Sequence, residues 1–262
     1  MTSLIASGRL LAYFQPQICC DTGTVTGFEA LARIDDPAQG IVAPGQFLPA
    51  LSAADHIQLT QAMLTQALSA LRSWEKAGWR VPTVSINVSP HDLRQPAFVD
   101  FILWELDRLE VGASRLVIEV PEHLNPLNAD ETCIDNLRRL ARAGCRIDLD
   151  DFGTGCTTLD SIRQFSAQRL KIDRSFITGC ADDPERQRMI LAILALADHL
   201  DLHVVAEGVE TRDEHYFLAQ IGCHEVQGYA IAAPLTLAQT MTFLQCHDNR
   251  QGELPRLRNI AS

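Results

Sequence analysis

The stretch that decides the fold is Arg146-Ile-Asp-Leu-Asp-Asp-Phe-Gly-Thr-Gly155, a short apolar run that ends in two adjacent carboxylates and a glycine turn. The apolar positions predict a buried strand, and the glycines predict a sharp turn after it. Adjacent strand residues point to opposite faces, but the turn lets Asp150 and Asp151 swing toward one site. Because adjacent carboxylates repel each other, we expect them to hold cations, with one carboxylate bridging two ions. An ordinary Asp-rich turn is the alternative.

Runs of the same character recur along the chain, each rich in Val, Ile or Leu and each followed by a polar residue or a loop. Together they make about eight strands, the number that closes an α/β barrel. Segments with helical spacing of apolar residues lie between them and favour helices packed outside the sheet. The predicted strands are 10–16, 25–33, 83–89, 116–120, 146–152, 169–173, 204–209 and 225–229. The predicted helices are 59–77, 98–109, 132–143, 186–200, 212–221 and 237–246.

The first connection is too short to contain a helix. Only Cys19-Cys-Asp-Thr-Gly-Thr24 separates Ile18 from Val25, and Gly23 can supply the positive φ of a hairpin turn. The first two strands should therefore be antiparallel, whereas right-handed crossovers make the later strands parallel. We expect an α/β fold, a TIM-like (β/α)8 barrel whose first strand runs antiparallel to the others.

Length and composition favour a single domain. A chain of 262 residues suits one large barrel, and 47% hydrophobic with 21% charged residues is the balance of a soluble globular protein. We expect residues 1–246 to form one domain and the polar residues 247–262 to be a fraying C-terminal tail. No apolar run approaches the roughly 20 residues that span a bilayer, which argues against direct membrane insertion.

Charge and cysteine content restrict the partners and the compartment. The formal net charge of -11 argues against binding a nucleic-acid polymer, because such binding depends on Lys and Arg. Metal ions mounted on acidic residues could still recruit a phosphate. The eight cysteines show no CxxC spacing, so buried thiols in a reducing compartment are expected rather than disulfides or zinc. We therefore expect a cytoplasmic location, as a free protein or as the cytoplasmic domain of a larger signalling protein.

Polar residues stand at the ends of the predicted strands, and in a βα barrel these ends meet on one face. Carboxylates with one amide, and no His or Cys, suit Mg²⁺ or Mn²⁺ rather than zinc. The carboxylates are too many for one octahedral ion, so we infer two ions with Asp150 as the bridge. Lys171 cannot ligate a metal, but its ammonium can orient or deprotonate a water and offset phosphate charge. The full set is Glu29, Asn87, Glu119, Asp150, Asp151, Lys171, Glu207 and Gln227.

The order and spacing of several short motifs resemble those of EAL-domain cyclic di-GMP phosphodiesterases, over roughly residues 10–245. Each motif is weak alone, but the ordered set is specific. The motifs are Tyr13-Phe-Gln-Pro16, Glu29-Ala-Leu-Ala-Arg33, Ile86-Asn-Val-Ser89, Glu119-Val-Pro-Glu122, Asp150-Asp-Phe-Gly-Thr-Gly155, Leu170-Lys-Ile-Asp173, Ala206-Glu-Gly-Val-Glu-Thr211 and Gln227-Gly-Tyr229. The resemblance implies an EAL-type barrel and a hydrolase of bacterial second-messenger signalling.

The resemblance also implies a reaction and its metal ions. Cyclic di-GMP would be hydrolysed to linear pGpG, with two Mg²⁺ or Mn²⁺ ions activating a water for in-line attack on phosphorus. Ca²⁺ should inhibit, because its longer bonds and looser geometry would misplace the water. The ligands of the first ion would be Glu29, Asn87, Glu119 and Asp150. The ligands of the second ion would be Asp150, Asp151 and Glu207.

Further roles follow from the same resemblance. Lys171 would position the water or assist its deprotonation, and Gln227 would hydrogen-bond in the same cluster. Glu122 would steady the loop that carries residues 151–159. The residues that would contact the substrate are Gln15, Leu31, Arg33, Asp173 and Pro234.

This sequence departs from the family pattern at four places. They are Leu51-Ser52 at a helix entry, Val120-Pro121, Asp148, and Cys156-Thr-Thr158 in place of an aromatic and two serines. Asp148 lies one layer deeper than Asp150 on the same strand face, where the family often has a small residue, so it needs a partner or a raised pKa. The change at residues 156–158 leaves open a homodimer of the kind that family members form near this loop. The proposed metal ligands are all present.

Two alternatives remain for the function. The first is a module of the same fold that binds cyclic di-GMP as a sensor with little or no catalysis, although such members usually lack metal ligands or the lysine. The second is an enolase-like barrel, in which carboxylates hold Mg²⁺ and a lysine is the base. The Asp150–Asp151 pair and the early hairpin argue against it.

Overall fold

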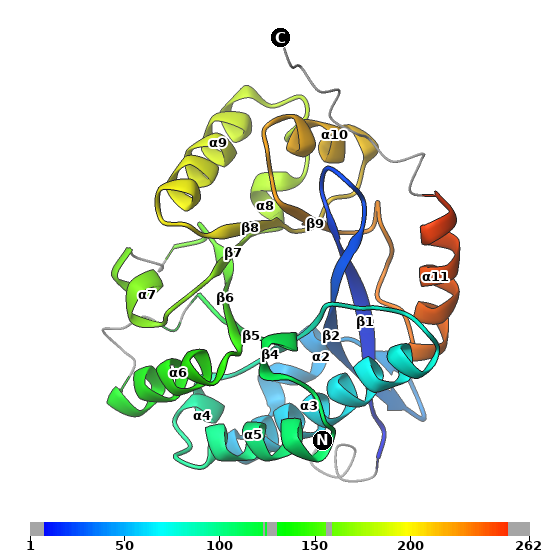
Figure 1. Cartoon of the computed structure of the whole chain (residues 1–262), viewed down its shortest axis with the longest axis vertical. Helices are drawn as coiled ribbons and strands as arrows, with labels where there is room; N and C mark the ends of the chain where they lie inside the picture. The colour runs from blue at the N-terminus through cyan, green and yellow to red at the C-terminus, as the bar shows by residue number, and fades with distance from the viewer. Residues whose placement is uncertain (1–7, 123, 125–129, 156–158, 251–262) are drawn as a thin grey trace.

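Eight strands pair edge to edge into a closed barrel with helices around it (Figure 1). The structure is a computed structural model that describes residues 8–122, 124, 130–155 and 159–250. The ring runs through β1 (Leu10–Cys19), β2 (Val25–Asp36), β4 (Thr83–Asn87), β5 (Leu116–Val120), β6 (Arg146–Phe152), β7 (Arg169–Ile172), β8 (His203–Ala206) and β9 (Glu225–Gln227), which pairs back to β1. The predicted barrel is confirmed, and β3 (Gly40–Val42) is an additional strand paired to the end of β2.

The strand β1 is the reversed strand of the barrel. It is antiparallel to both β2 and β9, whereas the other neighbouring pairs of the ring are parallel. The hairpin that follows β1 turns at Gly23, whose φ of 70° suits a residue without a side chain. Hydrogen bonds of 2.8 Å from Gly23 N to Cys19 O and from Cys19 N to Thr24 O close the turn. The predicted antiparallel first strand is therefore confirmed.

Helices connect the parallel strands and lie on the outside of the barrel (Figure 1). The longer ones are α3 (Ala53–Lys76), α5 (Phe98–Arg108), α6 (Glu131–Ala143), α9 (Pro184–His199), α10 (Arg212–Gln220) and α11 (Leu237–Arg250). The shorter ones, which the sequence did not predict, are α2 (Pro44–Phe47), α4 (Pro90–Leu93), α7 (Leu159–Gln164) and α8 (Arg174–Ile177), with 3-10 turns at Leu48–Ala50 and Ala113–Arg115. Every predicted long helix is present.

Helix ends differ from the predicted bounds where a side chain caps the helix. Ser89 was predicted as the end of a strand, but its hydroxyl accepts from Asp92 N, so it starts α4 with a capping box. Ser52 starts α3 in the same way, several residues before the predicted helix. α11 continues through Arg250, past the predicted helix end at Cys246, and the fraying of the C-terminal tail stays a prediction. Residues 251–262, the rest of that predicted tail, lie outside the described part of the chain.

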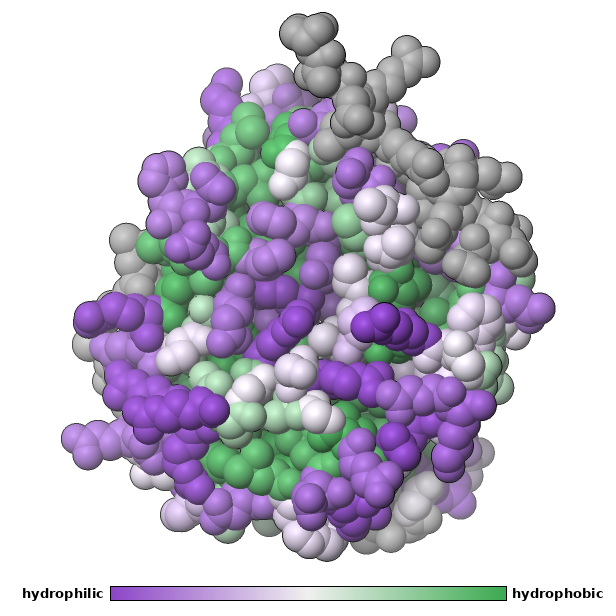
Figure 2. All heavy atoms as spheres, viewed as in Figure 1, coloured by the Kyte–Doolittle hydropathy of each residue, from purple (hydrophilic) through white to green (hydrophobic). Residues whose placement is uncertain are grey.

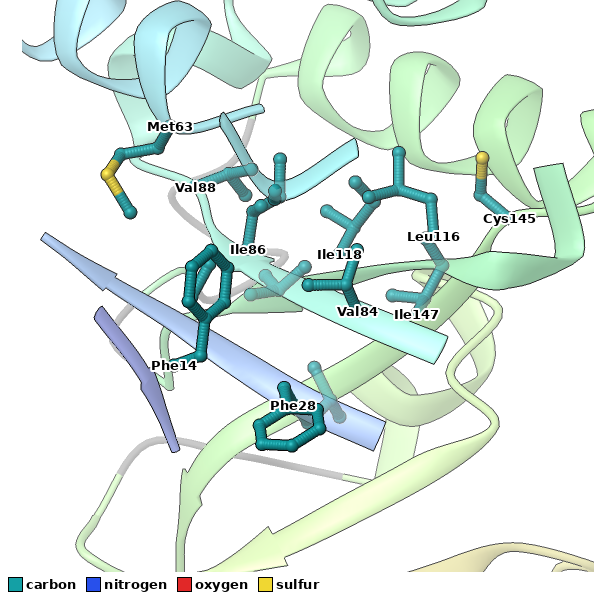
Figure 3. Close-up of a cluster of buried hydrophobic side chains, with 14 of the residues drawn as sticks. Phe14, Phe28, Met63, Val84, Ile86, Val88, Leu116, Ile118, Cys145 and Ile147 are labelled. Carbon is teal, nitrogen blue, oxygen red and sulfur yellow. The ribbon is translucent and has the colours of Figure 1, made fainter. Parts of the chain in front are cut away.

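The apolar core lies between the barrel and the helices that cover it. Figure 3 shows Phe14, Phe28 and Ile86 pointing into one cluster from neighbouring strands. Trp74 of α3 is fully buried, stacks on Phe28 with ring centroids 4.7 Å apart, and donates from Nε1 to the Thr240 hydroxyl at 2.8 Å. This packing ties α3 and α11 to the β1–β2 side of the barrel. Removing such a ring typically costs about 3–5 kcal/mol of stability.

Most of the described cysteines are buried, as the sequence indicated. Five of them are buried as free thiols, Cys20, Cys133, Cys145, Cys180 and Cys223. Cys156 lies outside the described residues. Within the described ranges, no helix combines the length and the apolar composition that crossing a bilayer requires. On the face in Figure 2, hydrophilic side chains gather near the middle of the molecule, and a broad hydrophobic area lies below them.

Candidate active site

The carboxyl end of β6 brings the side chains of Asp150 and Asp151 together. The pairing of β6 with β7 shifts register between Leu149 and Phe152, which is the mark of a β-bulge. Asp151 adopts a left-handed backbone with φ 52°. One carboxylate oxygen each from Asp150, Asp151 and Glu207 lie within 4.8 Å of one another. A bulge inside the strand, rather than the glycine turn after it, therefore gathers these carboxylates.

Lys171 is the cation at the centre of the site. It points into the barrel from β7, and its side chain is only 1% exposed. The four carboxylates around its ammonium, with their distances to Nζ, are Glu207 at 2.7 Å, Glu119 at 2.9 Å, Asp150 at 2.9 Å and Glu29 at 3.6 Å. Burial alone would lower the pKa of Lys171, but these carboxylates raise it well above its usual value. The ammonium therefore stays protonated in this arrangement.

One ammonium cannot neutralise four carboxylates, so protons are held more tightly on some of them. Burial, followed by repulsion from Glu29, raises the pKa of Glu119 well above its usual value. Burial raises the pKa of Glu207 to about 8, although Lys171 opposes the shift. Burial and the charge of Asp150 raise the pKa of Asp151. The site therefore has an unmet demand for positive charge, which divalent cations would satisfy by displacing protons.

Glu207 owes its place to the glycine that follows it. Gly208 has a φ of 68°, and a Cβ there would lie 2.4 Å from the Cβ of Arg174. Only glycine fits both the left-handed backbone and this close approach to α8. The turn leaves Glu207, just after β8, facing Lys171 rather than solvent.

Glu29 is held by amide donors on both sides. Burial raises the pKa of Glu29, but Lys171 and the hydrogen bonds from Gln227 and Asn87 outweigh it, so the net pKa is lowered. Asn87 Nδ2 donates to Glu29 Oε1 at 2.8 Å, and Gln227 Nε2 donates to Glu29 Oε2 at 2.6 Å. The structure thus brings Asn87 and Gln227, both predicted from sequence, onto the same carboxylate.

These residues form one polar layer inside the barrel, which we call the upper layer. Its members are Glu29, Asn87, Glu119, Asp150, Lys171, Glu207 and Gln227. The donor set of carboxylate and amide oxygens is the one that Mg²⁺ and Mn²⁺ prefer. Glu119 Oε1 is buried and has no hydrogen-bond partner among the described residues, although buried oxygens are normally satisfied. The upper layer therefore fits divalent cations.

Glu122 lies above this layer and holds the turn after β6. Its carboxylate accepts hydrogen bonds from the Thr154 hydroxyl and, at 3.1 Å, from the backbone of Gly155. This is the position expected of the residue that steadies the loop. Residues 156–158 of that loop, including the departure at Cys156-Thr-Thr158, lie outside the described residues.

A cleft of about 340 Å³ opens above the upper layer. Three of the predicted substrate-binding residues line it, Gln15, Leu31 and Asp173. Gln15 is fixed by donating from Nε2 to Ala232 O at 3.2 Å and by accepting from Gln227 at 3.1 Å. Asp173 caps α8 by accepting from Ser175 N at 2.9 Å.

Two predicted substrate-binding residues do not line this cleft. Arg33 is half-buried further along β2, donates to Ala32 O at 2.7 Å and lies over the Tyr13 ring at 5.6 Å. Pro234 precedes Leu235, whose backbone exchanges hydrogen bonds with Phe14. The structure brings neither side chain together with the acidic cluster.

A larger and mainly apolar pocket, which the sequence did not reveal, adjoins the cleft. It has a volume of about 640 Å³ and shares Glu29 and Leu31 with the cleft. Its other walls include parts of α2, α3, α4 and the segment after β5, among them Met63, His91 and Pro121. Residues from such distant segments carry no common sequence signal, so only the fold shows that they meet.

A second polar layer lies one step deeper in the barrel, and we call it the lower layer. It consists of Gln17, Asp148, Arg169 and Glu225. Asp148, the departure noted above, is fully buried and contacts Arg169 at 2.6 Å, so the partner that it needs is present. The sequence signal for this layer was the alternation in β6 and β7, which puts residues 148 and 169 beneath residues 150 and 171.

Comparison with known proteins gives a consistent result. MucR of Pseudomonas aeruginosa, a bifunctional diguanylate cyclase/cyclic di-GMP phosphodiesterase, is 34% identical over 234 residues, which is 89% of this chain and 34% of MucR. The cyclic di-GMP phosphodiesterase NbdA of the same organism is 36% identical over 253 residues, 96% of this chain and 32% of NbdA. The chain thus spans about a third of the length of these relatives.

A solved structure and a family model match the chain as well. A solved PaMucR phosphodiesterase in complex with c-di-GMP superposes with a TM-score of 0.82 at 32% identity, covering 91% of this chain and 96% of that one. The model of the EAL domain matches residues 1–234, which include β1 to β9 and all residues of both polar layers. The chain therefore belongs to the EAL domain family.

Proposed function

We propose that the chain hydrolyses one phosphodiester bond of cyclic di-GMP and releases linear pGpG. The observation that carries the proposal is the buried Lys171 ammonium inside a ring of four carboxylates, at the floor of a cleft. Support comes from MucR and NbdA, which are phosphodiesterases of this nucleotide, and from the PaMucR structure, which contains it.

Two divalent cations, Mg²⁺ or Mn²⁺, are part of the proposal. Glu29, Asn87, Glu119 and Asp150 would hold the first, and Asp150, Asp151 and Glu207 would hold the second. The second set already has oxygens within 4.8 Å of one another, and Asp150 belongs to both sets. When bound, the ions would supply Lewis-acid stabilisation of the charge that develops on the phosphate in the transition state.

Lys171 would orient the attacking water and the phosphate. Because its pKa is raised, its ammonium donates hydrogen bonds and does not act as a base in the arrangement seen here. Its position between Glu119 and Glu207 is fixed by contacts of 2.9 Å and 2.7 Å, so little entropy is lost when a substrate arrives. Gln227 would keep Glu29 oriented through its 2.6 Å hydrogen bond.

The remaining predicted residues would act on the substrate or on the loop. Gln15, Leu31 and Asp173 line the cleft and would contact the nucleotide. Arg33 and Pro234 stay predictions as substrate contacts, since they lie away from the cleft lining. Glu122 would keep the turn after β6 closed over the site through Thr154 and Gly155. A homodimer and a cytoplasmic location likewise stay predictions.

Anion-exchange chromatography of a timed reaction tests this function. With Mn²⁺, we expect cyclic di-GMP to be converted to pGpG, and we expect chelation or Glu29→Ala to stop the conversion. Glu75→Ala, which changes an outer salt bridge between Arg115 and α3, is a matched control that should keep activity. Substitution of Ca²⁺ should inhibit, and full activity with Ca²⁺ would count against the two-ion geometry.

The sensor alternative is an outcome of the same experiment. If substrate stays intact at high enzyme concentration with Mn²⁺, the hydrolase proposal fails. Binding of intact cyclic di-GMP in that sample, measured by equilibrium dialysis, would then identify a binding module of the same fold.

A further inference from the structure

Within the lower layer, Arg169, Asp148 and Glu225 form an ion triad. Arg169 of β7 contacts Asp148 of β6 at 2.6 Å and Glu225 of β9 at 2.7 Å. Arg169 is 3% exposed and Asp148 is fully buried. Burial lowers the pKa of Arg169, but the two carboxylates raise it, so the guanidinium remains a cation. None of these three side chains lines the cleft, so they cannot touch a substrate there.

Arg169 also donates a hydrogen bond to a residue outside the triad. Its Nη2 donates to Gln17 Oε1 at 3.3 Å, and Gln17 is completely buried in β1. Gln17 Nε2 then donates to Gln227 Oε1 at 2.8 Å, across the direct β1–β9 pairing of these two residues. Gln227 Nε2 donates to Glu29 Oε2 at 2.6 Å. Two amides therefore connect the lower layer to a carboxylate of the upper layer.

The direction of this chain of hydrogen bonds is the same from both ends, since the Glu29 carboxylate at the far end can only accept. A guanidinium has only donors, so the oxygen of Gln17 must face Arg169 and its NH₂ must face Gln227. Gln227 then has to turn its own oxygen toward Gln17, which leaves its NH₂ for Glu29 and for Gln15 Oε1 at 3.1 Å. Without Arg169 and Gln17, the Gln227 oxygen loses its donor, and the buried Gln227 amide is held only through its NH₂ by Glu29 and Gln15.

We propose that Gln17 and Arg169 are positioning residues that fix the orientation of the Gln227 amide and, through it, the Glu29 carboxylate for divalent-cation binding. This inference rests on the proposed function, in which Glu29 is a ligand of the first ion. It adds two residues that neither touch the substrate nor ligate the ions. Outer partners that orient metal ligands typically change metal affinity by about 10–100-fold when they are removed.

Variants of Gln17 test the proposal most cleanly, because Arg169 variants leave two buried carboxylates without their cation and would destabilise the chain for that reason alone. Gln17→Glu is nearly isosteric and can accept from Arg169, but its carboxylate cannot donate to Gln227. Gln17→Leu removes both hydrogen bonds and remains informative if the first variant folds poorly. Thr26→Val is the matched control, since Thr26 donates to Glu225 Oε2 at 2.9 Å and thus touches the triad away from the Gln17 side.

The measurements are the Mn²⁺ dissociation constant, from the electron paramagnetic resonance signal of free Mn²⁺, and the melting temperature of each chelated protein. We expect Gln17→Glu and Gln17→Leu to bind Mn²⁺ about tenfold or more weakly than the parent. Thr26→Val should lower the melting temperature but keep the parent affinity within about twofold. With cyclic di-GMP, the Gln17 variants should recover activity as Mn²⁺ is raised.

Two results would overturn the inference. The first is parent-like Mn²⁺ affinity in both Gln17 variants. The second is a loss of affinity that follows the melting temperature equally in all three variants, which would indicate a purely structural role. If the parent chain itself binds no Mn²⁺, both the inference and the metal part of the proposed function fail. If the parent binds Mn²⁺ and leaves cyclic di-GMP intact, only the proposed hydrolysis fails.

Discussion

The two polar layers inside the barrel use the same ingredients to opposite effect. In the lower layer one Arg169 guanidinium faces two carboxylates, Asp148 and Glu225, and a glutamine. In the upper layer one Lys171 ammonium faces four carboxylates. The lower layer nearly balances its own charge and does not line the cleft, whereas the upper layer stays anionic and opens into it. Incomplete neutralisation, rather than burial of charge, is therefore the property on which the upper layer is proposed as the functional one.

The largest effect should come from removing the cation of the upper layer. Lys171→Met leaves four carboxylates without a counter-charge and removes the donor that would orient water and phosphate. We expect the rate of cyclic di-GMP hydrolysis to fall by about a thousandfold, within the range for a positioned proton donor or acceptor. Chromatography of timed reactions measures it. The chain has one other lysine, Lys76 at the end of α3, and Lys76→Met should keep the parent rate. A Lys171→Met enzyme with more than a tenth of that rate would refute the assigned role.

Removing the cation of the lower layer should act on stability instead. Arg169→Met leaves Asp148 and Glu225 buried without their partner, which typically costs about 3 kcal/mol or more. Urea unfolding followed by circular dichroism measures the free energy of unfolding. The double variant Arg169→Met with Asp148→Leu removes one of the stranded charges and should regain part of the loss. An unchanged free energy of unfolding in Arg169→Met would show that the triad does not stabilise the fold.

Glu207 of the upper layer should make the stability of the chain depend on pH. The pKa of Glu207 is raised from 4.5 to about 8, so the folded chain binds a proton that the unfolded chain has already released. That contribution to stability is fully present below pH 4.5 and is lost as the pH rises through about 8. Thermal melts of the chelated chain from pH 6 to 9 should therefore show falling stability, and Glu207→Gln should flatten the trend. A trend that persists in Glu207→Gln would place its origin elsewhere.

Metal binding should show the reverse dependence on pH. Cations compete with the proton on Glu207, so Mn²⁺ affinity is expected to increase as the pH rises toward 8. The parent and Glu207→Gln can be compared at matched ionic strength by the same titration. An affinity that is constant between pH 6 and 8 would contradict competition at this carboxylate.

Much of the upper layer could be predicted because its members stand at predictable strand ends. Alternation along each strand and the parallel order of the barrel were enough to bring Glu29, Glu119 and Lys171 together. The hairpin at Gly23 could also be predicted from a short stretch of sequence, since a turn this short allows only antiparallel strands. Such features depend only on short stretches of sequence and on the general geometry of βα barrels.

The hydrogen bonds that link the two layers, and the pocket, could not be predicted in the same way. The contact of Gln17 with Gln227 joins residues 210 positions apart, and its direction depends on Arg169, so neither local pattern nor spacing reveals it. The strand bulge at Asp151 was expected as a turn, because a register shift depends on the partner strand β7. The helix starts at Ser52 and Ser89 differ from the predicted element bounds, because serine suits loops as well as caps.

The smallest effect should come from the turn above the upper layer. Thr154→Val removes the hydroxyl that donates to Glu122 but leaves the Gly155 backbone bond in place. A hydrogen bond to a charged group contributes about 1.5–3 kcal/mol, so activity should fall by about ten- to a hundredfold, less than in Lys171→Met. Thr65→Val, on α3 far from the cleft, serves as the control in the same steady-state assay. A loss as large as that of Lys171→Met would mean that the turn belongs to the catalytic machinery.

The number of Mn²⁺ ions bound per chain tests most directly whether the upper layer is the functional one. Equilibrium dialysis with the metal measured by atomic absorption gives this number for the parent, for Asp150→Asn in the upper layer and for Asp148→Asn in the lower layer. We predict two ions on the parent, a loss of binding in Asp150→Asn, and retained binding in folded Asp148→Asn. Equal Mn²⁺ binding by the parent and Asp150→Asn, or none by the parent, would contradict the assignment of the upper layer as a metal centre.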